Sequence, residues 1–221
     1  MTLSPKRIFL VDDHTLVREW LGNLLSQESD FLVVGQADSA PTALADMAAS
    51  PPDLAVIDLT LRNGSGLDLI KDLRNLCPRT LVVVLSMHEE IYYVERAFRA
   101  GARGYVTKRD STNSIVEAIR AVLAGRVYAR PELLASLTER MVGQAVEKPT
   151  RSAELLSDRE MEVFRRLGAG QPTRTIATEM NLSMKTVQAY SARIKEKLGL
   201  ANASELLREA VRWVENHPTG G

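Results

Sequence analysis

Residues 53–70 read DLAVIDLTLRNGSGLDLI, and this stretch decides the fold of the N-terminal half of the chain. An apolar run ends at Asp58, a polar loop with glycines follows, and from Gly66 onward apolar residues recur at helical spacing. A strand without polar alternation is typical of a parallel sheet that is covered by helices on both faces. We therefore expect a strand, a loop and a helix here, with Asp58 directly after the strand.

The same alternation recurs along the first 125 residues. The expected strands are Arg7–Val11, Phe31–Ala37, Asp53–Ile57, Leu81–Leu85 and Gly104–Thr107. The expected helices are Thr15–Glu28, Ala40–Ser50, Gly66–Leu76, Glu89–Ala100 and Ser111–Ala124. Five strands that alternate with five helices predict an α/β domain of the (βα)5 type, with a doubly wound parallel sheet.

The C-terminal part of the chain has the pattern of helices only. Pro131–Met141 is expected to be a short linker helix, and the polar stretch Gly143–Ser152 a flexible linker. Four further helices are expected, namely Asp158–Leu167, Thr173–Met180, Met184–Leu198 and Ala203–Glu215, with Ser157 and Glu160 as a capping box at the start of the first. The expected domains are therefore residues 1–125, a linker at 126–152, and a small all-α domain at 153–221.

Composition narrows the class of protein. Apolar residues make up 45% and charged residues 25% of the 221-residue chain, which is typical of a globular domain. Cys77 is the single cysteine, so an internal disulfide is excluded, and three scattered histidines make a His/Cys metal cluster improbable. The longest aliphatic run, Leu81–Leu85, is far too short to span a bilayer, and the first residues lack the apolar stretch of a signal peptide. We expect a cytoplasmic protein without membrane contact.

Charge is unevenly distributed along the chain, although the net charge is zero. Residues 1–125 contain 13 Lys and Arg against 16 Asp and Glu, whereas residues 151–221 contain 11 against 9. The segment between them, residues 126–150, contains 4 against 3. The mild basic excess therefore lies in the helical C-terminal part.

Polar residues follow the expected strands at one edge of the sheet. Ligands of doubly wound sheets bind outside the carboxyl ends of the strands, where Asp12, Asp13, Asp58, Ser86 and Lys108 are expected to meet. Three carboxylates that lie close together repel one another unless a divalent cation lies among them. Their oxygens favour a hard ion such as Mg²⁺, or Mn²⁺ in its place.

These residue types suit phosphoryl transfer, which needs a nucleophile and positive charge around the phosphoryl oxygens. Asp58 is the best-placed nucleophile, and Asp13, helped by Asp12, would hold the metal. Lys108 would contact the phosphoryl oxygens, and the Ser86 hydroxyl would bind one of them after transfer. The backbone carbonyl of Thr60 could supply a further metal ligand.

The first domain resembles the receiver domains of two-component response regulators. The resemblance rests on VDDH (11–14), IDLTLRNGSGLDL (57–69), VVVLSMHE (82–89) and GARGYVTK (101–108). It implies that Asp58 is the phosphoacceptor, that a histidine kinase donates the phosphoryl group, and that Ser86 and Tyr105 form a switch pair. Two departures from the family are Leu61-Arg62, where Met-Pro is usual, and Arg109, where many receivers have proline.

The helix expected at Met184–Leu198 has the features of a DNA-recognition helix. From Ser183 to Leu198 it contains four Lys and Arg against one glutamate. Val187, Ile194 and Leu198 are spaced to face the core. The other face carries Lys185, Gln188, Ala189 and Ala192, and the small and amide side chains among them permit close approach to a major groove.

The C-terminal domain resembles the LuxR/NarL-type helix-turn-helix domain. The motifs are LSDREMEVFRRLGAG (156–170), TIATEMNLSMKTVQAY (175–190) and IKEKLGL (194–200). The resemblance implies that the DNA-binding residues are Lys185, Thr186, Gln188, Ala189, Tyr190, Ala192, Arg193 and Lys197. It also implies that the last helix is a dimer contact. Thr175 and Gln188 depart from the usual glutamate and lysine, and Gln188 could pair with adenine.

The expected function is that of a transcriptional response regulator, which dimerises and binds an operator once Asp58 is phosphorylated. Apart from gaining and losing its own phosphoryl group, we expect no enzymatic activity. Two alternatives remain at this point. The first is an aspartyl-phosphate phosphatase or phosphotransferase, although such hydrolases favour Asp-x-Asp, whereas Asp12 and Asp13 are adjacent. The second is a receiver that acts only through protein–protein interactions, which salt-dependent binding to duplex DNA would exclude.

Overall fold

The computed structural model describes residues 4–61, 65–89, 91–110, 112–143, 155–180 and 182–216. The chain divides into two compact units, Met1–Val142 and Gly143–Gly221. Arg62, one of the two unusual loop residues, and most of the expected flexible linker lie outside the described residues.

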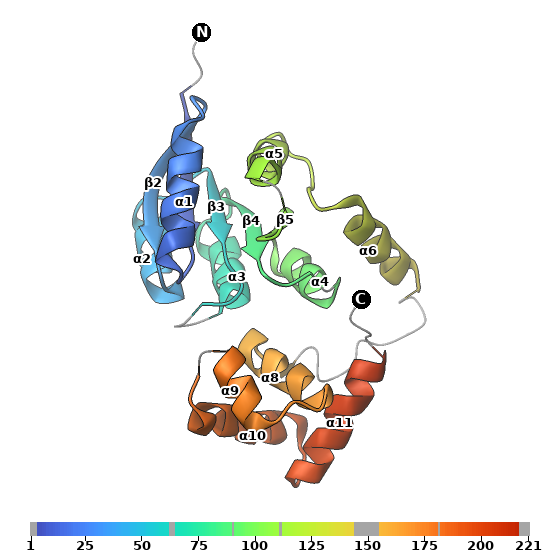
Figure 1. The fold of residues 1–221 in the computed structure, drawn as a ribbon. Coiled ribbons are helices and arrows are strands. Elements are labelled where there is room, and N and C mark those ends of the chain that lie inside the picture. The colour runs from blue at the N-terminus through green and yellow to red at the C-terminus, as the bar shows by residue number, and fades with distance from the viewer. Residues whose placement is uncertain are drawn as a thin grey trace. The chain divides into compact units, whose positions relative to one another are not determined.

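The first unit is built around a five-stranded parallel sheet (Figure 1). Its strands are β1 (Lys6–Val11), β2 (Phe31–Ala37), β3 (Leu54–Ile57), β4 (Leu81–Ser86) and β5 (Gly104–Thr107). They lie in the order β2-β1-β3-β4-β5. The predicted doubly wound (βα)5 sheet is therefore confirmed.

Helices cover both faces of this sheet (Figure 1). The helices α1 (Thr15–Ser26) and α5 (Thr112–Leu123) pack on one face, while α2 (Ala40–Ala49), α3 (Gly66–Leu76) and α4 (Ile91–Ala100) lie on the other. Every residue of β3 and of β5 is buried, because both strands have helices above and below them. This burial explains why the strands read as uninterrupted apolar runs.

The observed bounds differ from the expected ones at functionally relevant places. Ser86 is the last residue of β4 rather than a loop residue, because it pairs with Thr107 and its carbonyl accepts the backbone N–H of Lys108 at 2.8 Å. Helix α1 ends at Ser26, where the N–H groups of Gln27 and Glu28 turn back to the carbonyls of Leu24 and Leu25. Ser86 is therefore part of the sheet.

The chain after α5 returns to the sheet before it leaves the first unit. Gly125 has a φ of +79°, the left-handed conformation that ends many helices. Tyr128 then forms a parallel bridge with Gly104 at the outer edge of β5. The helix α6 (Pro131–Gly143) follows and begins at a proline, as expected.

The second unit contains four described helices, α8 (Asp158–Gly168), α9 (Thr173–Glu179), α10 (Met184–Leu198) and α11 (Ala203–Asn216). The predicted capping box is present, since the Ser157 hydroxyl accepts the N–H of Glu160 and the Glu160 carboxylate accepts the N–H of Ser157. Helices α10 and α11 pack against α8, and Val187 and Ile194 of α10 are fully buried. The predicted helical domain is confirmed.

Within the described parts of the chain, no helix is both long enough and apolar enough to cross a membrane.

Candidate functional site

Asp12 and Asp58 are brought together by the pairing of β1 with β3. Val11 lies opposite Ile57 in this pair, and the N–H of Asp58 donates to the carbonyl of Val11 at 2.8 Å. Each aspartate is the first residue after its strand, so both reach the same edge of the sheet. Asp12 is 2% exposed and Asp58 is 3% exposed, so both carboxylates are buried.

Lys108 enters this site from the end of β5. Its Nζ atom lies 2.7 Å from Oδ2 of Asp58 and 2.6 Å from Oδ2 of Asp12. Burial acts to lower the pKa of Lys108, but the carboxylates of Asp58 and Asp12 outweigh it and hold that pKa above its usual value. Lys108 therefore stays charged and links two acids that would otherwise repel each other.

Asp58 is less readily ionised than an ordinary aspartate. Burial raises the pKa of Asp58 from 3.8 to about 6, against the opposing attraction of Lys108 and with a contribution from the negative charge of Asp12. One lysine thus does not fully compensate the buried acids. Additional positive charge at this place would favour the ionised form of Asp58, which is the form that acts as a nucleophile.

The acidic residues are arranged to hold a cation. Oxygen atoms of Asp12, Asp13 and Asp58, together with a ring nitrogen of His14, all lie within 4.8 Å of one another. Carboxylate oxygens are the ligands that Mg²⁺ prefers. The donor set thus fits a hard divalent ion, as expected from the sequence. His14 was not expected there, yet its Nδ1 atom lies 3.2 Å from Asp12 and 2.9 Å from Asp13.

The loop after β3 holds Asp58 by its own backbone. The N–H of Thr60 donates to Oδ1 of Asp58 at 3.1 Å, so Thr60 lies beside the acidic cluster, and metal binding by its carbonyl stays a prediction. Gly66 closes the loop, and its N–H donates to the carbonyl of Leu59 at 3.0 Å. A Cβ atom on Gly66 would lie 2.1 Å from the carbonyl oxygen of Asp58, so no larger residue fits there. Leu61, which replaces the family's usual methionine, is buried.

Ser86 and Tyr105 are connected through His88. The Ser86 hydroxyl is buried and accepts the N–H of His88 at 3.3 Å. The Tyr105 hydroxyl donates to the carbonyl of His88 at 2.8 Å, and its ring is buried. The His88 ring stacks on Tyr93 with 4.0 Å between ring centroids, and its Nε2 atom lies 3.2 Å from the hydroxyl of Thr60. These contacts of His88 could not be predicted from the sequence, because a histidine in a loop has no periodic pattern that indicates its neighbours.

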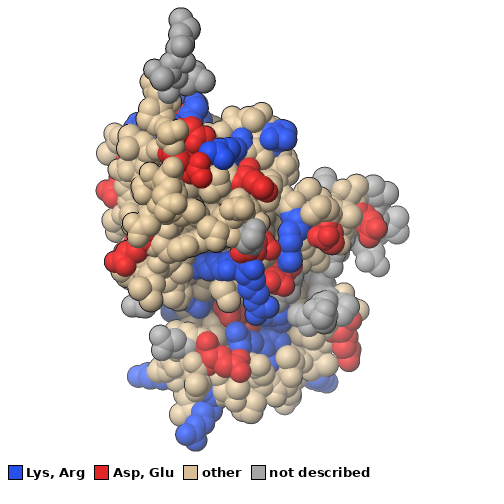
Figure 2. Space-filling view, turned by 45° about the horizontal axis from the view of Figure 1, so that its top comes forward, with Lys and Arg blue, Asp and Glu red and all other residues tan. Residues whose placement is uncertain are grey.

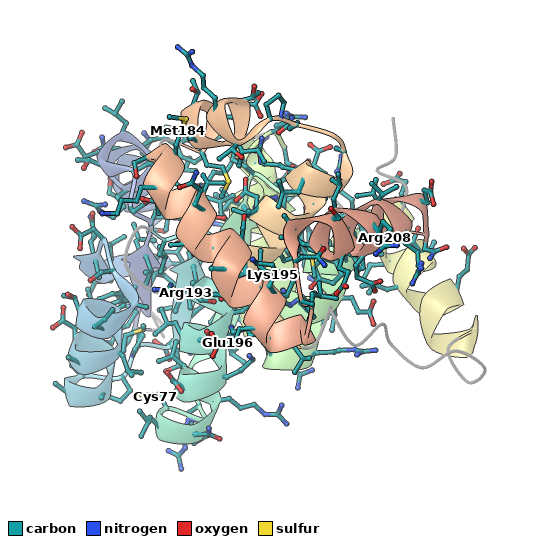
Figure 3. The ribbon with its side chains drawn as sticks, turned by 90° about the horizontal axis from the view of Figure 1, so that it is seen from below. Cys77, Met184, Arg193, Lys195, Glu196 and Arg208 are labelled. Carbon is teal, nitrogen blue, oxygen red and sulfur yellow. The ribbon has the colours of Figure 1, made fainter. Side chains whose placement is uncertain are left out.

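In the second unit, α10 presents the expected contact residues at its surface. Figure 3 shows Met184 at the start of this helix and Arg193, Lys195 and Glu196 along its later turns. The exposed members of the expected set are Lys185, Gln188, Ala189, Ala192 and Arg193, whereas Thr186 and Tyr190 are half-buried. The N-cap, Ser183, accepts the N–H of Thr186 at 3.0 Å and thereby fixes the first turn.

Lys197 differs from the other expected DNA contacts. Its Nζ atom lies 2.6 Å from Oε2 of Glu160, a buried residue of the capping box of α8. Lys197 therefore joins α10 to α8 within the unit. This ion pair was not foreseen, because the partners are far apart in the sequence. Tyr190 and Arg193 also interact, with the guanidinium 6.0 Å from the ring centroid.

Each of the two units matches a known protein family. The response regulator receiver domain matches residues 8–120, and the bacterial regulatory proteins of the luxR family match residues 154–210. The transcriptional regulatory protein UhpA of Escherichia coli is 33% identical, over 91% of this chain and 95% of that protein. The DNA-binding transcriptional activator DevR/DosR of Mycobacterium tuberculosis is 33% identical, over 97% of this chain and 98% of that protein.

A solved structure shows the same similarity in three dimensions. The two-component response regulator of the LuxR family from an Aurantimonas species is 35% identical and superposes with a TM-score of 0.59. The match covers 63% of this chain and 99% of that one.

The raised pKa of Asp58 predicts a stability difference between the wild-type chain and Asp58→Asn in the absence of divalent cations. The folded pKa of about 6 exceeds the unfolded value of 3.8, so the folded state prefers the protonated carboxyl. Stability of the wild type is therefore lost as pH rises from 4 to above 6, by at most about 3 kcal/mol. Asp58→Asn does not lose stability in this way, because asparagine has no carboxyl group to ionise.

Urea unfolding in EDTA at pH 4.5 and pH 7.5 measures the effect. Asp58→Asn is expected to be more stable than wild type by about 1–3 kcal/mol at pH 7.5, with a smaller difference at pH 4.5. Added Mg²⁺ should stabilise the wild type more than the variant. A variant that is less stable than wild type at pH 7.5 would contradict the physical account of the site.

Proposed function

Because the chain belongs to the two-component response regulators with a LuxR-type DNA-binding domain, we propose that Asp58 accepts a phosphoryl group from a sensor histidine kinase and thereby controls DNA binding. One observation carries the assignment of Asp58. It is a buried carboxylate held 2.7 Å from the ammonium of Lys108 and directly beside two further acids. This arrangement combines a nucleophile with the positive charge that phosphoryl transfer needs.

Asp12, Asp13 and Asp58, with the backbone carbonyl of Thr60, would hold Mg²⁺ or Mn²⁺ in this site. Such an ion, when bound, neutralises charge on the phosphoryl oxygens and on the acids. The donor chemistry supports this choice, since three of the clustered ligands are carboxylates. Asp12 contacts Lys108, and the ring of His14 lies beside both Asp12 and Asp13.

Each protein group has a role in the transfer. An oxygen of ionised Asp58 attacks the phosphorus, and the bond from phosphorus to the kinase's histidine nitrogen breaks. Lys108 stays in contact with the new acyl phosphate and balances its charge. The hydroxyl of Ser86 turns toward a phosphoryl oxygen. Such a turn weakens the contact that this hydroxyl makes with the N–H of His88.

The change at Ser86 then reaches the surface of the receiver unit. His88 also accepts the hydrogen bond of Tyr105, so a shift of His88 changes the position of that ring. Ser86 and Tyr105 thereby act as a pair, as the family resemblance implies. The face formed by α4, β5 and α5 changes as a result, and two chains associate.

DNA binding is assigned to α10 of the second unit. Lys185, Gln188, Ala189 and Ala192 would reach base edges in the major groove, while Thr186, Tyr190 and Arg193 would contact phosphates. The exposure of the first group supports this division. Lys197 would contribute least, because Glu160 already holds its charge. In a homodimer joined through α11, two such helices would meet half-sites about 34 Å apart. We place the protein in the cytoplasm, where kinase domains and DNA are accessible.

The phosphoacceptor assignment predicts which aspartate gains the phosphoryl group. Wild-type chain mixed with Mg²⁺ and acetyl phosphate should gain one phosphoryl mass in intact-protein mass spectrometry, whereas Asp58→Asn should gain none. Asp72→Asn, which alters an exposed aspartate of α3, serves as the matched control and should behave like wild type. Equal labelling of Asp58→Asn and wild type would refute the assignment.

Two substitutions on α10 are expected to weaken DNA binding in different ways. Arg193→Ala should reduce affinity for all duplexes alike and lower the salt slope by about one, because the lost charge contacts a phosphate. Gln188→Ala should cost about 1–3 kcal/mol only at sites with the preferred base, and leave the salt slope unchanged. Fluorescence anisotropy at several salt concentrations separates the two effects. Arg79→Ala, at an exposed residue that follows α3 in the first unit, is the control, and equal losses in all three variants would contradict the proposed interface.

A further inference from the structure

The outer edge of β5 is covered by a segment that follows α5. We name this segment, Arg126–Arg130, the latch. The N–H of Tyr105 donates to the carbonyl of Tyr128, and the N–H of Tyr128 donates to the carbonyl of Arg103, at 2.8 and 3.0 Å. Tyr128 thus pairs with the edge of the sheet as a sixth strand would, over a single residue.

Side chains hold the latch at its middle residue, Tyr128, and at its last residue, Arg130. The ring of Tyr128 packs against the core on the α1 and α5 side of the sheet, and its hydroxyl lies 3.4 Å from Glu117. Arg130 lies 3.7 Å from Asp110 and 3.8 Å from Glu89. Figure 2 shows basic and acidic side chains next to each other on the visible face of this unit. These ion pairs are long, so each adds little to the strength of the latch.

Helix α6 contributes few further contacts that hold this segment on the receiver unit. Within Pro131–Glu139, Leu137 is the one side chain that is buried. The start of the helix is held by the latch, since the carbonyl of Arg130 accepts the N–H of Leu134 at 3.1 Å. Freeing the latch therefore frees the beginning of the segment that leads to the second unit.

A continuous series of hydrogen bonds runs from Ser86 to the latch. Ser86 accepts from the N–H of His88, the carbonyl of His88 accepts from the hydroxyl of Tyr105, and the N–H of Tyr105 donates to Tyr128. Tyr105 belongs to the switch pair and is also the residue of this series that binds the latch. A displacement of its backbone relative to Tyr128 would stretch this bond.

We propose that the latch is an intramolecular contact which phosphorylation weakens, so that the receiver signals to the linker through the main chain of Tyr105. The inference rests on the phosphoryl transfer to Asp58 proposed above. When the Ser86 hydroxyl turns to the phosphoryl group, His88 loses a hydrogen bond and Tyr105 shifts. The backbone of β5 then no longer aligns with the N–H and carbonyl groups of Tyr128. Residues 126–137 are then released from the receiver.

The coupling between phosphorylation and the latch is reciprocal, so it can be tested without knowing the operator sequence. If phosphorylation weakens the latch, a chain with a broken latch must bind a phosphoryl group, or its mimic, more tightly by the same factor. Tyr128→Pro removes the N–H that donates to Arg103 and disfavours the edge pairing. Tyr128→Phe keeps the backbone bonds and the ring and loses only the hydroxyl, so it is the matched control.

Isothermal titration of the full chain with beryllofluoride in Mg²⁺ measures this coupling. Tyr128→Pro should bind about tenfold more tightly than wild type, the factor that corresponds to one net hydrogen bond, and Tyr128→Phe should match wild type. Equal affinity of Tyr128→Pro and wild type, with a cooperative receiver unfolding transition in both, would overturn the latch. Absence of binding to wild type would instead overturn the Asp58 assignment, and the latch with it.

Amide hydrogen exchange gives a second readout. In wild-type chain saturated with beryllofluoride, exchange at Tyr105 and Tyr128 should accelerate by about tenfold, while exchange in the centre of β3 stays unchanged. Unchanged exchange at both tyrosines in a sample that has bound the mimic would overturn the latch and leave the function of Asp58 intact.

Discussion

The contact of Lys108 with two buried aspartates is the interaction on which the receiver site depends. Its ammonium lies within 2.7 Å of oxygens of both Asp12 and Asp58, and both acids are almost fully buried. One positive charge holds these two negative charges at the end of the sheet, and the raised pKa of Asp58 shows that the compensation is incomplete. A bound cation would therefore stabilise the site. The same positive charge would stabilise the oxygens of a phosphoryl group on Asp58.

The parallel sheet explains why so much of this site follows from the sequence. Asp12, Asp58 and Lys108 each come directly after a short apolar run, and the carboxyl ends of parallel strands share one edge. Burial on both faces makes such strands visible as uninterrupted apolar runs, so the strands and most helices could be predicted closely. The same holds for the capping box of Ser157 and Glu160, which is a strictly local pattern.

Contacts between distant segments were the part that the sequence did not reveal. His88 links Ser86 to Tyr105 through its main chain, and main-chain contacts leave no trace in side-chain chemistry. Tyr128 likewise meets β5 through backbone atoms. Lys197 pairs with Glu160 of α8, which lies 37 residues away along the chain, and its contact with DNA stays a prediction. Spacing rules describe one helix or strand at a time and cannot show such partners.

The receiver site depends on Asp58 being a buried acid whose charge is only partly compensated by Lys108. Titration of the full chain, followed by the carboxyl carbon resonance of Asp58, measures this directly. In the absence of divalent cations we predict a pKa of about 6 for Asp58, and a lower pKa once Mg²⁺ is present. A pKa at or below the ordinary value of 3.8, with no response to Mg²⁺, would contradict the central claim.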